Sequence, residues 1–331
     1  MSDNEFTVIL DKREGADIRG ATVGGAELFG KPIYKTGSTG LADSIKAVLD
    51  EGLIHVPTYS LVAGRAFVGK ENEAWSQYHD SRAERITALD EKGIMGAKGT
   101  VYALDIQNGG LFVWNPQRIK EAVEGSKLVN YTIQLEQEEV NAVLDAMKRG
   151  DTAALKQIVH GGNVAYAGDF KGFVEASAVP GFIQGMDTAY LVIRPATDAR
   201  KLKSDYQNID AQRENPDVII ASGGKAPAGR MLDQAKGFEW VKFGAWHDGY
   251  NNNNTGRVVC LDSDYYGVLG NRYMCSSGRP VGVAPEALDV FYKHKNVDPL
   301  TVIVNQAMRT SRPVQHGDGA ILYVSNVQVR Q

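Results

Sequence analysis

Cysteine is scarce in this sequence, which has only Cys260 and Cys275 among its 331 residues. Two cysteines fall far short of the disulfide framework of a small secreted domain, so both are expected to be reduced and buried. Long apolar runs are missing too, and none approaches the roughly 20 residues needed to span a bilayer. The first residues lack the basic start and apolar core of a signal peptide. We therefore expect a soluble, cytoplasmic protein that does not bind membranes.

Motifs for structural metals and for nucleotides are also lacking. The six histidines show no metal-ligand spacing, and packing against an apolar face is the expected role of each. Neither G-x-x-x-x-G-K-[ST] nor G-x-G-x-x-G occurs. The net charge is −4 with 23% charged residues, which excludes a dominant basic surface. Sequence-specific binding of nucleic acid is therefore not expected.

Glycine, in contrast, is abundant: there are 36, and several occur in pairs such as Gly109-Gly110 and Gly223-Gly224. Each pair marks a sharp turn or a close approach of the backbone. Hydrophobic residues make up 43%, enough for a sizeable core. Helical and strand patterns alternate along the chain without an internal repeat. The pattern predicts an α+β or mixed α/β fold with an extended N-terminal arm, one long helix and a compact mixed-sheet portion.

Three parts are expected from the order of these patterns. Residues 1–40 are glycine-rich and weakly patterned, typical of an arm that lies over another surface. Residues 41–160 form a helix-rich part with a long helix over 71–91, because Trp75, Tyr78 and later apolar residues recur at threes and fours. Residues 161–331 form an α/β part centred on 217–266. The apolar stripe of the long helix is narrow, so much of the helix is expected to face solvent or a partner.

Shorter elements are predicted by their start and stop signals. The expected helices are 41–50, one that opens at Pro116, a pair over 137–160 that breaks at Gly150-Asp151, 228–236 and 285–294. The expected strands are 6–10, 100–106 and 111–114 as a hairpin, 127–135, 189–193, 218–221, 238–243, 257–261, 300–305 and 320–329, with extended structure over 53–68.

The segment Ser222-Gly223-Gly224-Lys225 lies between the expected strand 218–221 and the expected helix 228–236. Free backbone N–H groups at the start of a helix, together with the helix dipole, favour an anion. A phosphate site is one interpretation of this segment. An ordinary tight turn is the other.

Asp262 and Asp264 follow the apolar strand that ends at Leu261. This arrangement resembles the D-x-D motif of metal-dependent glycosyltransferases, and carboxylate oxygens suit Mg²⁺ or Mn²⁺. The resemblance implies that the two aspartates hold the ion. The alternative is an acidic turn at the end of a strand, with no metal and no cofactor.

A polar and aromatic region accompanies these aspartates. Tyr250, Tyr265 and Tyr266 lie among asparagines, a composition typical of adaptable contact surfaces. With Trp75 and Tyr78 of the expected long helix, they form the predicted contact surface. A carbohydrate- or protein-binding module that acts through this region is therefore an alternative function.

The order of the elements resembles that of a tailed-phage major coat protein. The resemblance is carried by the arm, the long helix over 71–91, and the α/β portion that Asn215-Pro216-Asp217-Val218-Ile219-Ile220 leads into. It implies a self-assembling, homo-oligomeric shell subunit of the virion that is assembled in the host cytoplasm. Its arm and long helix would pack on neighbouring subunits, and it would have no catalytic residues. This is the leading hypothesis, ahead of the glycosyltransferase-like enzyme and the binding module.

Overall fold

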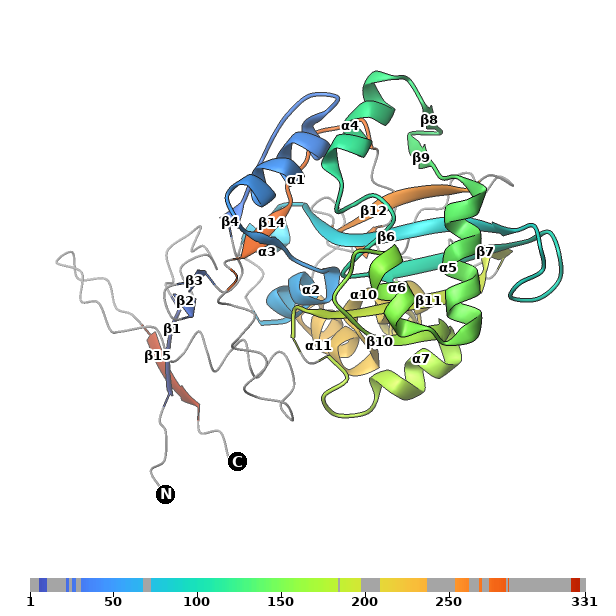
Figure 1. Cartoon of the computed structure of the whole chain (residues 1–331). Coiled ribbons are helices and arrows are strands. Elements are labelled where there is room, and N and C mark those ends of the chain that lie inside the picture. Colours follow the sequence, from blue (N-terminus) through green and yellow to red (C-terminus); the bar gives the residue numbers. More distant parts are fainter. Residues whose placement is uncertain are drawn as a thin grey trace.

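A computed structural model of the chain shows a mixed α+β protein (Figure 1). The structure describes residues 6–10, 22–23, 26–27, 31–67, 73–183, 185–197, 209–236, 254–261, 268–269, 274–283, 285 and 323–327. In this part of the chain, no helix is long and apolar enough to cross a membrane. The fold class predicted from the sequence is confirmed.

One large mixed sheet organises the molecule. Its strands follow the order β10, β11, β7, β6, β12, β9, β8, and β13 also pairs with β12. β10 and β11 run parallel, whereas the other pairs are antiparallel. The strands are β6 (His79–Asp90), β7 (Thr100–Gln107), β8 (Leu128–Val129), β9 (Thr132–Gln134), β10 (Asn163–Asp169), β11 (Thr188–Pro195), β12 (Thr255–Leu261) and β13 (Val268–Leu269).

Side chains alternate between the two faces of this sheet, and each face has its own core. On the first face, Ile86, Leu104 and Leu191 pack with residues of four helices in a single apolar cluster. These helices are α1 (Gly40–Asp50), α4 (Pro116–Glu124), α5 (Gln137–Arg149) and α6 (Thr152–Ile158).

The second face is covered by a different set of helices. Tyr190, Val192 and Val259 point to this side and share a core with α2 (Thr58–Phe67), α7 (Phe170–Ser177), α10 (Pro216–Ser222) and α11 (Lys225–Ala235). α2 packs against both α10 and α11. Helices on both faces bury the central strands, so these strands have few positions for solvent-facing polar residues.

The helices with clear capping signals agree with prediction. α5 begins with a capping box between Glu136 and Glu139 and ends at Gly150, which has a left-handed backbone with φ 64°. Asp151 then caps α6 by accepting from the Ala154 N–H. α1, α4 and α11 lie at their predicted places, as do the strands β1 (Phe6–Leu10), β11, β12 and β15 (Tyr323–Val327). The predicted strand over 127–135 is a short hairpin of β8 and β9.

The predicted long helix over 71–91 is wrong. Among the described residues of this range, Glu73–Ser76 is helical, as α3, and His79–Asp90 is the central strand β6. Polar residues of this segment were expected on a solvent-exposed helix face, but Glu84 and Arg85 are buried on opposite faces of the sheet. A strand buried on both sides cannot show the usual alternation of apolar and polar residues, so the helical spacing was coincidental.

Two further segments differ from prediction because their flanking residues outweigh their apolar pattern. Residues 218–221 were expected as a strand, yet they lie in α10, which Asn215 caps and Gly223 ends. All four are buried, as in a helix that is apolar all round. The expected extended run over 53–68 is β5 (Ile54–His55) followed by α2, which starts just after Pro57.

The predicted hairpin across Asn108-Gly109 is also wrong. β7 pairs with β6 and β11, and residues 111–114 form no strand. The backbone N–H groups of Leu111, Phe112 and Val113 instead donate to the buried carboxylate of Glu84 at 2.7, 2.8 and 2.5 Å. The Glu84 carboxylate therefore accepts the hydrogen bonds that a partner strand would accept in a hairpin.

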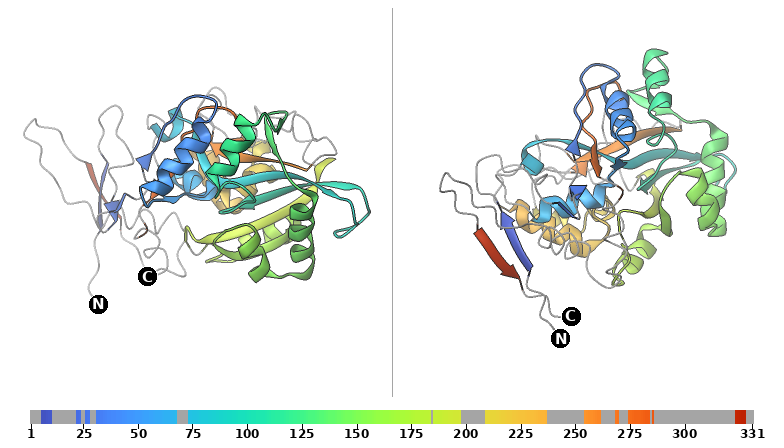
Figure 2. Two further views of the ribbon diagram at one scale, coloured as in Figure 1. Left: turned by 45° about the horizontal axis from the view of Figure 1, so that its top comes forward. Right: turned by 60° about the vertical axis from the view of Figure 1, so that its left-hand side comes forward.

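The strands near the two termini pair within this chain. β1 and β15 form an antiparallel pair, and their positions side by side are clear in Figures 1 and 2. β14 (Val281–Val283) pairs with β4 (Lys31–Pro32) and with β5, while β2 (Thr22–Val23) pairs with β3 (Ala26–Glu27). The large sheet also joins strands from both sides of the boundary predicted after residue 160, so that boundary does not separate two sheets. The predicted elements 238–243, 285–294 and 300–305 lie outside the described residues, apart from residue 285.

Candidate binding pocket

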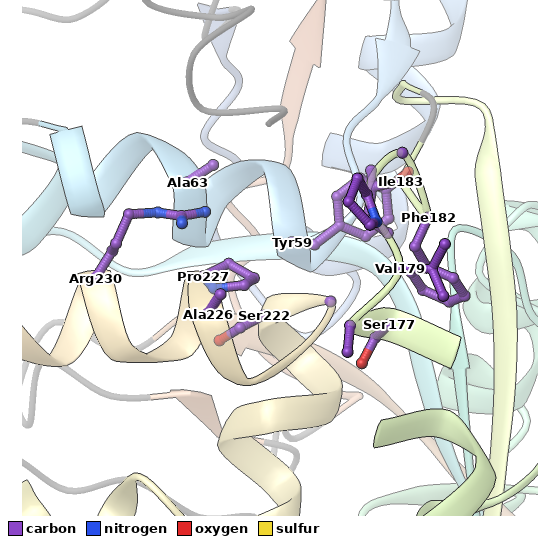
Figure 3. Close-up of a pocket in the computed structure, with 14 residues that line it drawn as sticks. Tyr59, Ala63, Ser177, Val179, Phe182, Ile183, Ser222, Ala226, Pro227 and Arg230 are labelled. Carbon is purple, nitrogen blue, oxygen red and sulfur yellow. The ribbon is translucent and has the colours of Figure 1, made fainter. Parts of the chain in front are cut away.

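A pocket of about 260 Å³ opens between α2, the turn that joins α10 to α11, and the segment after α7 (Figure 3). Its lining is mostly apolar, with a few polar side chains at its edges. The lining residues are Tyr59, Ala63, Ser177, Ala178, Val179, Pro180, Gly181, Phe182, Ile183, Ser222, Gly223, Ala226, Pro227 and Arg230. The site therefore joins residues that are far apart in the sequence.

The turn between α10 and α11 depends on its two glycines. Gly223 has φ 80° and ends α10 in the left-handed conformation, and Gly224 has φ 138° and begins α11. Side chains other than glycine strain such a backbone. A Cβ on Gly224 would also lie 3.1 Å from the Ser177 side chain, and one on Gly223 would lie 3.3 Å from Ile183. This close approach brings the start of α11 to the wall of the pocket.

A buried charge network holds α10 on the sheet. Asp217, in the first turn of α10, accepts from Arg85 at 2.7 Å and from Arg194 at 2.5 Å. Asp105 on β7 pairs with the same two arginines. All four side chains are at most 7% exposed, and two positive charges meet two negative ones. The network therefore fixes the position of α10, and with it the position of the pocket, relative to three strands.

Aromatic rings form the base next to the pocket. Tyr59 and Tyr190 stack with centroids 6.0 Å apart, and Phe182 lies 5.7 Å from Tyr190. The Tyr190 hydroxyl donates to the Ile220 carbonyl at 2.6 Å, and burial raises its pKa well above the usual value. The Tyr59 hydroxyl lies within 2.9 Å of two backbone carbonyls of the segment 185–188. Because its hydroxyl is already bonded, Tyr59 presents apolar ring surface to the pocket, as Phe182 does, and Tyr190 packs behind them.

Polar groups without a hydrogen-bond partner in the described part of the chain lie near the start of α11. Gly224 provides no side-chain cap, and the N–H groups of Lys225 and Ala226 precede the first intrahelical bond. Ser222 lines the pocket, is 2% exposed, and its hydroxyl has no hydrogen-bond partner among the residues described. Figure 3 shows it beside Ala226 and Pro227. The hydroxyl of Ser177, by contrast, donates to the Val174 carbonyl.

The rim of the pocket is apolar and open to solvent. Ala178, Val179 and Pro180 are all exposed, and Val179 is 61% exposed, which is unusual for a large hydrophobic residue. They continue the apolar lining outward from Phe182. Arg230 lies at the opposite side of the pocket, beside Ala63 of α2 (Figure 3). The opening therefore has an apolar edge and a cationic edge.

The pocket includes one segment that the sequence singled out. Ser222 to Lys225 was expected to follow a strand, but it lies where two helices meet, and its first two residues, Ser222 and Gly223, line the pocket. The remaining residues of the pocket gave no signal in the sequence. In the sequence, the pair Gly223-Gly224 indicated the turn that forms one wall of the pocket. The contributions of α2 and of residues 177–183 depend on long-range packing.

The other predicted site residues lie elsewhere. Trp75 is fully buried, with the Arg65 guanidinium 5.3 Å from the centroid of its ring, and Tyr78 is half-buried. Asp262 and Asp264, the predicted metal ligands, are outside the described residues, as are Tyr250, Tyr265 and Tyr266. Within the described ranges, no group of three or more potential metal ligands is found.

Comparison with known proteins identifies the fold. No protein-family model and no curated protein sequence matches the chain. A solved structure described as "Accommodation of massive sequence variation in Nanoarchaeota by the C-type lectin fold" matches with a TM-score of 0.51. It is 16% identical and covers 77% of this chain and 98% of that one.

This match overturns the predicted resemblance to a phage coat protein, and with it the virion, capsid and self-assembly hypothesis. The glycosyltransferase-like alternative depends on Asp262 and Asp264, which lie outside the described residues, so it stays a prediction. The long helix that supported the coat-protein comparison is a strand. The chain has a C-type lectin-like fold.

Proposed function

We propose that this chain is a protein-binding module that recognises an apolar side chain of its partner in the pocket between α2, α10 and α11. The observation that carries the proposal is the continuity of the apolar lining with the exposed Ala178-Val179-Pro180 rim. Exposed apolar surface around a preformed cavity is typical of sites where proteins associate.

The chemistry of the pocket favours a protein over a sugar as the partner. Sugars present many hydroxyl groups, and a site that excludes water from them must return hydrogen bonds. Here Tyr59 is already bonded to backbone carbonyls and Ser177 to Val174, so few polar groups remain for a ligand. An apolar side chain, in contrast, gains roughly 1.5–3 kcal/mol when it is fully buried.

The C-type lectin-like fold supports the same proposal. The solved structure that resembles this chain is described as accommodating massive sequence variation. A scaffold that tolerates variation suits recognition, because the binding residues can change while the core is kept. In this chain the core on both faces of the sheet is separate from the exposed rim residues, which are therefore free to vary.

Selection from a displayed library of random peptides tests the proposal. The immobilised full chain is expected to enrich peptides with a large apolar residue. Val179→Asp is expected to weaken their binding at least tenfold, because it places a charge on the apolar rim. Leu49→Asp is the matched control, since Leu49 is an exposed hydrophobic residue on α1, remote from the pocket lining. Equal loss in both variants, or no enriched peptide, would contradict the proposal.

A second candidate is binding of carbohydrate or protein through Tyr250, Tyr265 and Tyr266. The polar and aromatic composition of this region favours such binding. Within the described residues, β12 is the rigid element that lies between Tyr250 and Tyr265 in the sequence. The start of β12 is anchored by Asn254, which accepts from the Leu89 N–H and donates to Gln137. Leu261, at the other end of β12, is roughly 20 Å from this anchor. In the sequence, Tyr250 precedes Asn254, and Tyr265 and Tyr266 follow Leu261.

A glycan array together with the peptide selection distinguishes this second candidate from the first. If the tyrosine region binds, Tyr250→Ala or the double change at Tyr265 and Tyr266 reduces the array or peptide signal, and Val179→Asp leaves it unchanged. Because Tyr250 and the Tyr265-Tyr266 pair flank opposite ends of β12, we expect only one of the two to contact the ligand. Either Tyr250→Ala or the double change, but not both, should then reduce binding strongly. Unchanged binding in all tyrosine variants would end this idea.

A further inference from the structure

We propose that the pocket recognises a two-part motif in its protein partner: an apolar side chain that fills the cavity, and an Asp or Glu two residues away that pairs with Arg230. This inference rests on the proposed protein-binding function and specifies the sequence that is bound. It follows from the different chemistry of the two ends of the pocket.

Two helices give the pocket its direction. α2 contributes Tyr59 and Ala63 to the lining, and α11 contributes Ala226 and Arg230, so each helix presents residues four apart. Residues at this spacing share one face of a helix and lie about 6 Å apart along its axis. In Figure 3, Tyr59 lies toward Phe182, whereas Ala63 and Arg230 lie at the opposite end. The two ends of the pocket are therefore about one helical turn apart.

The first end suits an apolar side chain. Val179, Phe182 and Ile183 line it together with Tyr59, whose hydroxyl is already bonded to backbone carbonyls. A polar group of the partner would lose its hydrogen bonds to water at this end and gain none in return. The apolar residue of the motif is therefore assigned to this end.

The second end suits an acidic side chain. Among the described residues that line the pocket, Arg230 has the one charged side chain, and none is a carboxylate. Other charges on or next to α11 belong to ion pairs outside the lining: Lys225 with Glu214 at 2.5 Å, and Arg213 with Asp233 at 2.6 Å. A ligand in the pocket therefore meets a positive charge, and the planar guanidinium of Arg230 matches the geometry of a carboxylate.

The separation of the two ends determines the spacing of the motif. In an extended peptide, side chains two residues apart point to the same side and lie about 6.6 Å from each other. This distance matches the helical turn of about 6 Å between the two ends. A side chain at the adjacent position points away, and one four residues along is about 13 Å distant. An apolar residue, any residue and an acidic residue, in this order or its reverse, therefore fit the pocket.

Capped heptapeptides test the inference, because their blocked ends leave a side chain as the only carboxylate. Each has a neutral fluorescent label, an amidated C-terminus and a Gly-Ser background with one Leu and with Glu two positions before or after it. Fluorescence anisotropy with the full chain measures binding. In one order at least, the Glu peptide is expected to bind about tenfold tighter than its Gln counterpart. A peptide with Glu directly next to Leu is expected to bind no better than the Gln peptide.

Two arginines provide a matched pair of variants. Arg230→Gln is expected to remove the preference for Glu and to leave binding of the Gln peptide within about twofold, because only the charged pair is lost. Arg213→Gln removes the same charge outside the lining, where Arg213 pairs with Asp210 and Asp233, and is expected to keep the preference. Thermal unfolding verifies that both variants fold.

Salt provides a test that needs no variant. Raising NaCl from about 50 to about 500 mM screens the contact between Arg230 and a carboxylate. In the unchanged chain, this increase is expected to weaken the Glu peptide severalfold and to leave the Gln peptide nearly unchanged. Equal salt dependence of the two peptides would contradict the pairing with Arg230.

The outcomes separate the inference from the proposed function. Equal binding of the Glu and Gln peptides, both abolished by Val179→Asp, would overturn the inference and keep the protein-binding function. A preference for Glu that persists in Arg230→Gln would also overturn the inference, because the carboxylate would then contact another residue. Library peptides that bind without an acidic residue at this spacing would do the same. If neither the heptapeptides nor any library peptide binds, both proposals fail.

Discussion

The two faces of the sheet handle buried charge in different ways. On the first face a single carboxylate, Glu84, is satisfied by three backbone N–H groups of the segment 111–113. On the second face, two aspartates and two arginines neutralise one another beneath α10. The first arrangement fastens a loop with a single titratable carboxyl group, whereas the second fastens a helix with four charges that cancel. Stability should therefore depend on pH through the first face and on side-chain pairing through the second.

The largest expected effect comes from breaking the pairing on the second face. Asp105→Ala leaves Arg85 and Arg194 with one aspartate between them, and an uncompensated buried charge costs about 3–5 kcal/mol. Urea unfolding followed by circular dichroism measures this loss in free energy. Asp210→Ala is the control, because that carboxylate is 80% exposed in its pair with Arg213. A loss below about 1 kcal/mol for Asp105→Ala would mean that the network does not hold α10.

Changing the pH tests the first face. Burial raises the pKa of Glu84 to about 7 from an ordinary 4.5, although its backbone hydrogen bonds and Arg118 act in the opposite direction. The folded state therefore holds the proton more tightly than the unfolded state. The stabilisation is complete below about pH 4.5 and is lost as the pH rises through 7, a change of about 3 kcal/mol.

Glu84→Gln removes this titration and is the natural control for it. Between pH 4.5 and 7.5 the free energy of unfolding, measured with urea, is expected to fall by about 3 kcal/mol more in the unchanged chain than in the variant. Parallel curves for the two proteins would show that Glu84 keeps an ordinary pKa, and that the N–H groups of 111–113 stabilise its charged form.

Helix caps on the two faces offer a smaller test. Asn215 caps α10 on the second face at 4% exposure and also donates to Gln212, whereas Asn115 caps α4 on the first face and is half-buried. Replacement by Ala is expected to cost about 2 kcal/mol at Asn215 and about 1 kcal/mol at Asn115. Thermal unfolding compares the two variants. A larger loss at Asn115 would reverse the expected order.

The smallest effect is expected at the pocket itself. Ser222→Ala removes a buried hydroxyl that has no partner among the described residues, so the free energy of unfolding should change by less than about 0.5 kcal/mol or rise slightly. A binding defect in this variant would then reflect the ligand and not the fold. A loss above about 1 kcal/mol would show that Ser222 supports the structure of the turn.

The elements predicted best from the sequence are those whose ends carry capping or helix-breaking residues. Gly150 and Asp151 marked the break between α5 and α6, and Pro116 marked the start of α4. β6 was mistaken for a helix because the reasons for burying Glu84 and Arg85, three N–H groups and two aspartates, come from distant segments. Local patterns show the caps, whereas the pairing of buried charges becomes visible only once the sheet is assembled.

The same limit applies to the pocket. The turn at Gly223-Gly224 could be recognised in the sequence, since two adjacent glycines indicate an unusual backbone. The apolar run before it was taken for a strand, although Asn215 and Pro216 gave a start signal for a helix. Tyr59 and Val179 reach the site only through packing of α2 and of the segment after α7, which no spacing in the sequence encodes.

The pairing of β1 with β15 has a mechanical consequence. Phe6 lies opposite Val327 and Leu10 opposite Tyr323. The strand residues nearest the two chain ends, Phe6 and Val327, are therefore paired at the same end of the ladder. Tension applied through the two ends of the chain would load one pair of residues at a time, as in opening a zipper, instead of shearing all hydrogen bonds together. These two strands would separate at low force, and the large sheet would remain folded as they do.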